Sequence, residues 1–171
     1  EEAKKIIPGE NLGAVISKES KERIERYIGE AERDGAKILV DGRNTKVKGK
    51  ENGTYVGPTV IDFVKPEMSV ATEEIFGPVI SIMGFKDEAE AIKIANDTPY
   101  GLAGYVSAGS VEHARKVARQ IRAGNINLNG VPNERTAPFG GYKQSGNGRE
   151  WGKFGLDEYL EVKAIAGFGA V

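Results

Sequence analysis

The sequence predicts an α/β fold with a largely parallel sheet flanked by helices. Segments with strand patterns and helix patterns alternate through most of the 171 residues, which is typical of parallel strands joined by helical crossovers. The run 79–85 is almost continuously apolar, as expected of a strand buried on both faces of a parallel sheet. A helix-capping signal at Asp87 follows this run directly, so the strand leads into a helix.

The first half of the chain contains one amphipathic helix and two extended segments. Ser17 is a suitable N-cap for the helix, and Gly35 is a suitable stop. Residues 36–40 and 55–64 are predicted to be extended, and the Lys-, Gly- and Asn-rich loop 42–53 between them is predicted to be exposed and mobile. The apolar residues of the helix recur at i, i+3, i+4 and i+7, which predicts its buried face. They are Ile24, Tyr27, Ile28 and Ala31.

The second half repeats the alternation of helix and strand. Asp87 and Glu90 form a capping box that opens a helix, and residues 98–101 end it. A strand at 102–107 leads to a helix capped by Ser110, for which Gly124 is the predicted stop. The apolar residues expected to be buried on these two helices are Ala89, Ile92, Ala95, Val111, Ala114, Val117, Ala118 and Ile121.

The last part of the chain is less regular. A short strand is predicted at 125–129, a long loop runs on to Gly148, a helical turn lies near Trp151, and a final strand spans 159–165. A chain of this length can bury a sufficient core without disulfides or metals. We therefore expect one domain over residues 1–171.

Bulk composition excludes several classes of function. With 24 Lys and Arg against 25 Asp and Glu, the net charge of -1 provides no field that would attract nucleic acid or an anionic membrane. The absence of cysteine and the single histidine, His113, exclude thiol nucleophiles, disulfides and a histidine or cysteine metal site. No apolar run approaches the roughly 20 residues of a membrane span, so a cytoplasmic protein is expected. The start at Glu1, without an initiator methionine, suggests a piece of a longer protein.

Three short patterns have ordinary structural interpretations. His113 lies on the polar side of its helix with no candidate partner nearby in sequence, so a surface position is expected. The glycine loop 146–152 is one residue longer than the dinucleotide-binding fingerprint, and too few residues follow it for a βαβ unit, so it is interpreted as a loop that enters a helical turn. Glu73 and Glu74 cannot flank one glycosidic bond, because adjacent residues of an extended segment point to opposite sides.

Residues 73–79, with the sequence EEIFGPV, are the most informative segment. Gly77 and Pro78 form a turn that leads into the apolar strand. Glu74 and Phe76 therefore lie at a strand entrance, and strand ends are where α/β proteins bind ligands. A carboxylate beside an aromatic ring suits a hydroxylated, planar ligand. The alternative is a solvated acidic pair with Phe76 in the core.

The loop 130–141, GVPNERTAPFGG, is the second candidate. Its two prolines stiffen it, and its paired glycines allow close backbone approach. Arg135 and Phe139 supply a charge and a ring. A loop of this kind after a parallel strand is either a pocket wall or an ordinary crossover connection.

Several motifs, taken together and in this order, resemble the NAD(P)-dependent aldehyde dehydrogenase superfamily. The resemblance extends from about Gly13 to the C-terminus and covers the back of the family's catalytic domain and its terminal strand. The motifs are EEIFGPV at 73–79, Asn96 with YGLA at 100–103, PFGGYKQSG at 138–146, Arg149 with Glu150, and EVK at 161–163.

The resemblance implies oxidation of an aldehyde to a carboxylic acid through a cysteine thioester. Hydride passes to a nicotinamide, and a glutamate-activated water hydrolyses the thioester. In the family, the cysteine, that glutamate and the dinucleotide-binding domain all lie upstream of the matching region. No catalytic residue and no metal ligand is therefore assigned here, and the chain alone is expected to be inactive.

The resemblance also implies binding residues. Glu74 matches the glutamate that accepts hydrogen bonds from the ribose hydroxyls on the nicotinamide side of NAD or NADP, and Phe76 matches the aromatic residue that packs near the nicotinamide. Phe139 matches a position at the substrate tunnel. Arg135 falls in the family's variable substrate-anchoring loop, and we hypothesise that it holds the distal carboxylate of a semialdehyde, because guanidinium and carboxylate pair bidentately.

Two interpretations of the whole chain stay open. In the first, it is the C-terminal portion of an aldehyde dehydrogenase that forms a homodimer or homotetramer through a strand at about 159–171. In the second, it is a free-standing truncated homologue that acts as a non-catalytic binding or oligomerisation module. Neither interpretation involves nucleic acid or a membrane.

Overall fold

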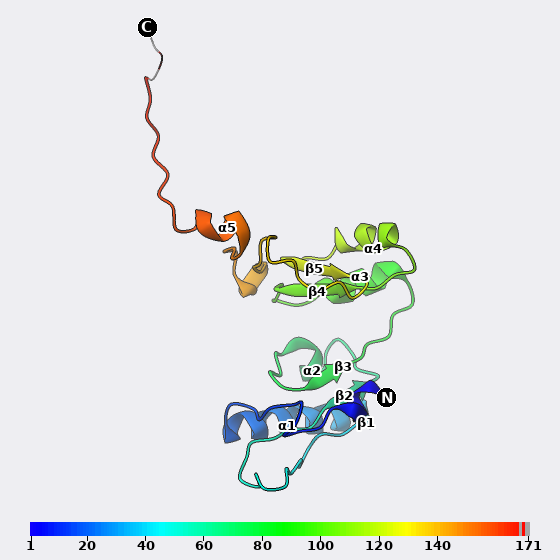
Figure 1. Ribbon diagram of the computed structural model, residues 1–171. Helices are drawn as coiled ribbons and strands as arrows, with labels where there is room; N and C mark the ends of the chain where they lie inside the picture. The colour runs from blue at the N-terminus through cyan, green and yellow to red at the C-terminus, as the bar shows by residue number, and fades with distance from the viewer. Residues whose placement is uncertain (168, 170–171) are drawn as a thin grey trace. The chain divides into compact units, whose positions relative to one another are not determined.

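A computed structural model describes residues 1–167 and 169 of the chain, and its contacts group into two compact units (Figure 1). The first unit is Glu1–Lys86 and the second is Asp87–Val171. The expected single domain over 1–171 stays a prediction. In chain order the elements are η1 (Glu2–Lys5), α1 (Lys18–Arg33), β1 (Lys37–Val40), β2 (Thr59–Asp62), α2 (Ser69–Thr72), β3 (Val79–Ser81), α3 (Glu88–Asn96), β4 (Ala103–Val106), α4 (Val111–Ala118), β5 (Asn125–Leu128), η2 (Lys143–Ser145) and α5 (Gly152–Asp157).

The first unit packs α1 and α2 with a small mixed sheet of order β1-β2-β3. β1 pairs antiparallel with β2, and β2 pairs parallel with β3. The predicted helix start is confirmed, since the Ser17 hydroxyl accepts a hydrogen bond from the Ser20 amide at 3.1 Å. The predicted apolar face is confirmed at Ile24, Ile28 and Ala31, which are fully buried.

Gly77 holds the loop before β3 against α1. A Cβ atom at Gly77 would lie 2.6 Å from Cδ1 of Ile24, closer than real Cβ atoms approach a neighbour. The loop therefore depends on a residue without a side chain, and the buried Ile24 fixes its path.

The expectation for 79–85 is only partly correct. The strand covers Val79–Ser81 and pairs parallel with β2, as predicted. Burial on both faces is wrong, because Ile80 is 59% exposed and Phe85 is 62% exposed. β3 is the edge strand of its sheet.

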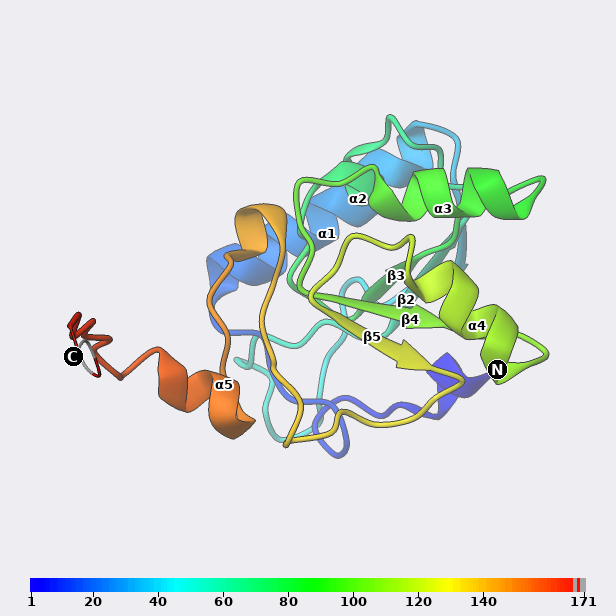
Figure 2. The same cartoon turned by 90° about the horizontal axis from the view of Figure 1, so that it is seen from above.

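The second unit contains the parallel pair β4-β5 with α4 packed against it (Figure 2). Both predicted caps are confirmed: Asp87 accepts from the Glu90 amide, and Ser110 accepts from the His113 amide. Ala114 on α4 is fully buried, as predicted. The α/β class with small sheets flanked by helices is thus confirmed, and two of the three strand pairs are parallel.

Side chains join α3 and α4 at both of their ends. Near the N-terminal ends, the Glu88 carboxylate forms a hydrogen bond with Nε2 of His113. Near the C-terminal ends, Asn96 donates to the Gln120 carbonyl at 2.8 Å and accepts from the Arg122 amide at 2.7 Å. His113 is exposed, as expected, but it has a partner 25 residues away that no local pattern predicts.

Several expectations about the helices of the second unit are wrong. Ala89 and Ala95 are exposed, so α3 buries less of its apolar face than its periodicity predicts. Val111, at the start of α4, is also exposed instead of buried. Gly124 does not end a helix, because α4 stops at Ala118 with Arg119 as its C-cap. Gly124 instead precedes β5 at a site of close backbone approach, where a Cβ atom would lie 1.7 Å from the Gly140 carbonyl oxygen.

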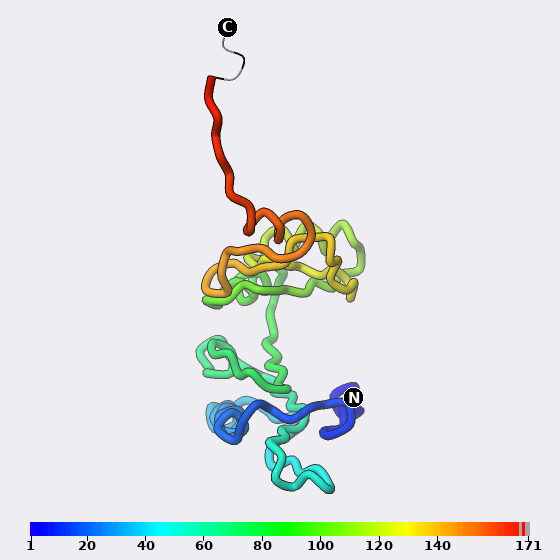
Figure 3. The backbone as a smooth tube through the Cα atoms, turned by 60° about the vertical axis from the view of Figure 1, so that its left-hand side comes forward, coloured from blue at the N-terminus to red at the C-terminus, as the bar shows by residue number. Residues whose placement is uncertain are grey.

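The strand predicted at 159–165 is not formed. The segment is extended and exposed, with Val162 97% exposed, and the red part of the trace in Figure 3 follows it. A strand requires a hydrogen-bonded neighbour, and no other segment of the described chain pairs with these residues. Residues 168, 170 and 171 of the oligomerisation strand predicted at about 159–171 lie outside the described residues.

We predict that Gly77→Ala destabilises the protein. The added methyl group must displace Ile24, and overpacking of this kind costs about 1 to 3 kcal/mol. Chemical denaturation of the variant and the parent measures the difference in the free energy of unfolding. Gly84→Ala is the matched control, because a Cβ atom there meets nothing within 4 Å. Equal stability of the two variants would contradict the proposed contact.

We predict a larger loss for Gly124→Ala. The obstruction at Gly124 is backbone, which yields less easily than a side chain, so the expected cost is about 3 kcal/mol or more. The shift in the denaturation midpoint tests this, with Gly109→Ala as the control in open space. A Gly124→Ala variant as stable as that control would mean that the loop at Gly140 moves freely away from β5.

Candidate functional site

The four residues predicted to bind ligands lie in two separate loops. Glu74 and Phe76 belong to the first unit and come from the loop between α2 and β3. Arg135 and Phe139 belong to the second unit and come from the long connection between β5 and η2. The structure therefore groups the residues in the two pairs that the sequence motifs indicate.

The loop before β3 presents a carboxylate and an aromatic ring together. Ile75 is buried, whereas its neighbours Glu74 and Phe76 are exposed, and Phe76 is 72% exposed. The alternative that Phe76 lies in the core is therefore wrong. Ile75 anchors the loop in the core of the first unit, and Gly77 fixes it against α1.

Among the described residues, neither side chain takes part in a hydrogen bond, an ion pair or ring stacking. Phe76 has a φ of 57°, in the left-handed region that a bulky side chain rarely adopts. No hydrogen bond or ion pair involves the Glu74 carboxylate within residues 1–167 and 169. Such an arrangement leaves four acceptor lone pairs and an open ring face for a ligand.

Phe139 is held by the backbone of a second segment. Its amide donates to the Glu150 carbonyl at 2.8 Å, and its carbonyl accepts from the Glu150 amide at 2.7 Å, which forms an isolated antiparallel bridge. The bridge brings Trp151 to the Phe139 ring. The two rings are stacked, with centroids 4.6 Å apart and planes 28° apart.

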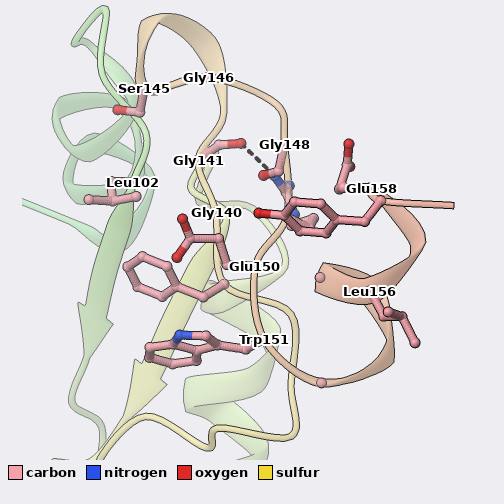
Figure 4. A pocket seen from close by; sticks show the side chains of 15 residues that line it. Leu102, Gly140, Gly141, Ser145, Gly146, Gly148, Glu150, Trp151, Leu156 and Glu158 are labelled. Atoms are coloured by element: carbon pink, nitrogen blue, oxygen red, sulfur yellow. Dashed lines mark hydrogen bonds between the residues drawn. The ribbon is translucent and has the colours of Figure 1, made fainter.

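A pocket with a volume of about 750 Å³ lies beside this ring pair, and Figure 4 shows Trp151 and Ser145 at opposite ends of it. This volume is within the range of small-molecule sites. Glycines form much of its wall, together with the two rings and Tyr159, the first residue of the segment 159–165. The lining residues are Leu102, Phe139, Gly140, Gly141, Ser145, Gly146, Gly148, Arg149, Glu150, Trp151, Gly152, Gly155, Leu156, Glu158 and Tyr159.

Arg149 fixes the glycine-rich wall. Its Nη1 donates to the carbonyl oxygens of Gly141 at 2.9 Å, Asn147 at 3.0 Å and Gly148 at 2.9 Å, and the dashed line in Figure 4 marks the first of these. The guanidinium also lies over the Tyr142 ring, 5.5 Å from its centroid. One charged group thus satisfies three carbonyls of a loop that has little other structure.

Arg135 does not line this pocket. It lies in a turn in which the Thr136 amide and hydroxyl donate to Glu134 Oε1 at 3.1 and 3.0 Å. These hydrogen bonds, from the amide first, lower the pKa of the Glu134 carboxyl. The Arg135 side chain is exposed and has no ion pair or hydrogen bond among the described residues.

The glycine loop 146–152 has the structural role expected of it, since Gly146 and Gly152 have positive φ and the loop enters α5. Sequence reasoning did not select Arg149 or Trp151 as site residues. No cluster of metal-ligating side chains occurs among the described residues. Within the same residues, no helix is both long and apolar enough to cross a bilayer.

The sequence profile of the aldehyde dehydrogenase family matches residues 3–165. A 3-succinoylsemialdehyde-pyridine dehydrogenase from a Pseudomonas species is 48% identical, over 96% of this chain and 36% of that protein. The chain therefore spans about a third of the length of this relative.

Solved structures of two aldehyde dehydrogenases have the same fold. Aldehyde dehydrogenase C from Pseudomonas syringae, crystallised with NAD+ and octanal, is 43% identical with a TM-score of 0.91, over 99% of this chain and 36% of that one. Betaine aldehyde dehydrogenase from Staphylococcus aureus is 42% identical with a TM-score of 0.87, over 95% of this chain and 34% of that one.

Proposed function

Because this chain belongs to the aldehyde dehydrogenase family, we propose that it is the C-terminal portion of an NAD(P)-dependent enzyme that oxidises an aldehyde to a carboxylic acid. The observation that carries the proposal is the loop at Glu74 and Phe76, which exposes a carboxylate and an aromatic ring two residues apart, on either side of the buried Ile75. The two compact units together contribute to one catalytic domain in this proposal.

The chain supplies binding groups rather than the reacting ones. It contains no cysteine, and the thiol nucleophile, the glutamate base and the dinucleotide-binding domain are assigned to sequence outside it. An isolated chain is therefore expected to have no dehydrogenase activity. It is also expected to bind NAD weakly, because most of the contacts that offset the ordering cost lie elsewhere.

Glu74 and Phe76 fit the nicotinamide half of the cofactor. A vicinal diol presents two hydroxyl donors to one carboxylate, and Glu74 has that carboxylate exposed. The exposed face of Phe76 suits a planar ring, whose position must be fixed for hydride transfer. When bound, the cofactor accepts the hydride that the aldehyde loses.

Phe139 and Arg135 are assigned to the substrate. Phe139 borders a pocket of suitable size, and the P. syringae relative was crystallised with octanal. Arg135 offers a guanidinium that has no ion pair within the described part of the chain, on a turn ordered by Glu134, and such a group suits a carboxylate at the far end of a substrate. The name of the Pseudomonas relative refers to a semialdehyde, which is the substrate class proposed for this enzyme.

The complete enzyme is proposed to be a homodimer or homotetramer. The exposed segment 159–165 has no strand partner in the described chain, and pairing with a neighbouring subunit would supply one. A cytoplasmic location stays a prediction.

We predict that Glu74→Gln weakens cofactor binding in the full-length enzyme. A hydrogen bond to a charged group contributes about 1.5 to 3 kcal/mol, so the KM for NAD or NADP should rise at least about tenfold. Steady-state kinetics with the aldehyde at saturation measures the change. Glu73→Gln is the matched control and should stay within about twofold of the parent. Similar KM values for both variants would remove Glu74 from the cofactor site.

We predict that Arg135→Ala discriminates between aldehydes. The KM for succinic semialdehyde should rise about tenfold, because a charge-paired contact is lost, while the KM for butanal, which has no carboxylate, should be unchanged. Arg119→Ala, which removes an exposed arginine elsewhere in the second unit, is the control. An equal change in KM for both aldehydes in Arg135→Ala would contradict the assignment of Arg135 to the substrate carboxylate.

A further inference from the structure

We propose that Trp151 is a positioning residue that sets aldehyde specificity through Phe139. This inference rests on the proposed function, in which Phe139 contacts the substrate. Trp151 stacks on Phe139 with a centroid distance of 4.6 Å, and both rings border the same pocket. The Trp151 ring thereby limits the orientations that the Phe139 ring can adopt.

The backbone fixes the register of this ring pair. Phe139 exchanges two hydrogen bonds with Glu150, which holds the next residue, Trp151, close enough for its ring to stack on the Phe139 ring. Arg149, which precedes Glu150 in sequence, donates hydrogen bonds to three carbonyl oxygens of the pocket wall. Hydrogen bonds therefore hold both Arg149 and Glu150 in place, and Trp151 follows them directly.

The backbone of Trp151 is in a conformation that only glycine adopts readily. Its φ is 69° and its ψ is 152°, in a region that costs a residue with a side chain about 1 to 3 kcal/mol. Glycines follow at 152 and 155, where a Cβ atom would meet backbone atoms of Thr136 at 2.4 Å and of Glu150 at 3.1 Å. Glycine would relieve the strain at 151 as well. A large aromatic ring there is consistent with a role that the ring itself performs.

The ring pair is better suited to shaping a wall than to binding a charge. The Nη1 group of Arg149 is already committed to carbonyl oxygens, and Phe139 and Trp151 are apolar over their stacked faces. A long apolar acyl chain offers such a wall far more apolar contact area than a two-carbon aldehyde does. Specificity for chain length is the property that the pair should control.

The test uses the full-length enzyme with octanal and acetaldehyde as probes. Trp151→Gly removes the ring and the strain together, and the KM for octanal should rise about threefold to tenfold, the factor that corresponds to one aromatic pair. The kcat for octanal and the KM for acetaldehyde should stay within about twofold. Trp151→Phe should retain the parent KM for octanal, and Trp151→Leu, which keeps apolar bulk without a ring, should not.

A double-mutant cycle separates this role from a general loss of structure. In a Phe139→Ala background, Trp151→Gly should cause no further change in the KM for octanal, because Trp151 acts only through Phe139. Additive effects, or equal losses for both aldehydes, overturn the inference while leaving the substrate role of Phe139 intact. An unchanged KM in Phe139→Ala itself overturns that substrate role, and the inference with it. If Trp151→Gly does not fold, equal KM values for octanal in Trp151→Phe and Trp151→Leu overturn the inference.

Discussion

Close backbone approach at glycine is the constraint on which both candidate loops depend. In the first unit, Gly77 lets the loop that carries Glu74 and Phe76 lie directly against Ile24 of α1. In the second unit, Gly124 lets β5 begin against the carbonyl of Gly140. Hydrogen bonds alone would hold these loops less firmly, because they tolerate rotation. A contact that leaves no room for a Cβ atom fixes the path of the chain more closely.

The local structure was largely predictable because its signals are local. Ser17, Asp87 and Ser110 cap helices as their sequence contexts indicate, and the periodicity of α1 identified a face that is buried at Ile24 and Ile28. Each of these features depends on residues within about one or two turns. The family motifs likewise selected Glu74, Phe76 and Phe139, of which Phe139 borders a pocket.

What the sequence did not predict depends on distant partners. Ile80 is 59% exposed although its strand is apolar, because the burial of a strand residue depends on which element covers that face of the sheet. The partner of His113 lies on another helix, and Gly124 acts through a loop that follows it in the chain. Trp151 gave no pattern of its own, because its contact with Phe139 is set by a backbone bridge between non-adjacent segments. Sequence periodicity contains no information on such pairings.

The stacking of Trp151 on Phe139 has an optical consequence. Trp151 is the one tryptophan in the 171 residues, and it borders the pocket directly. Within this chain, all indole emission therefore originates at a single, defined position in the wall of that pocket. A molecule that enters the pocket changes the polarity around the indole, so the chain contains its own fluorescent reporter of occupancy.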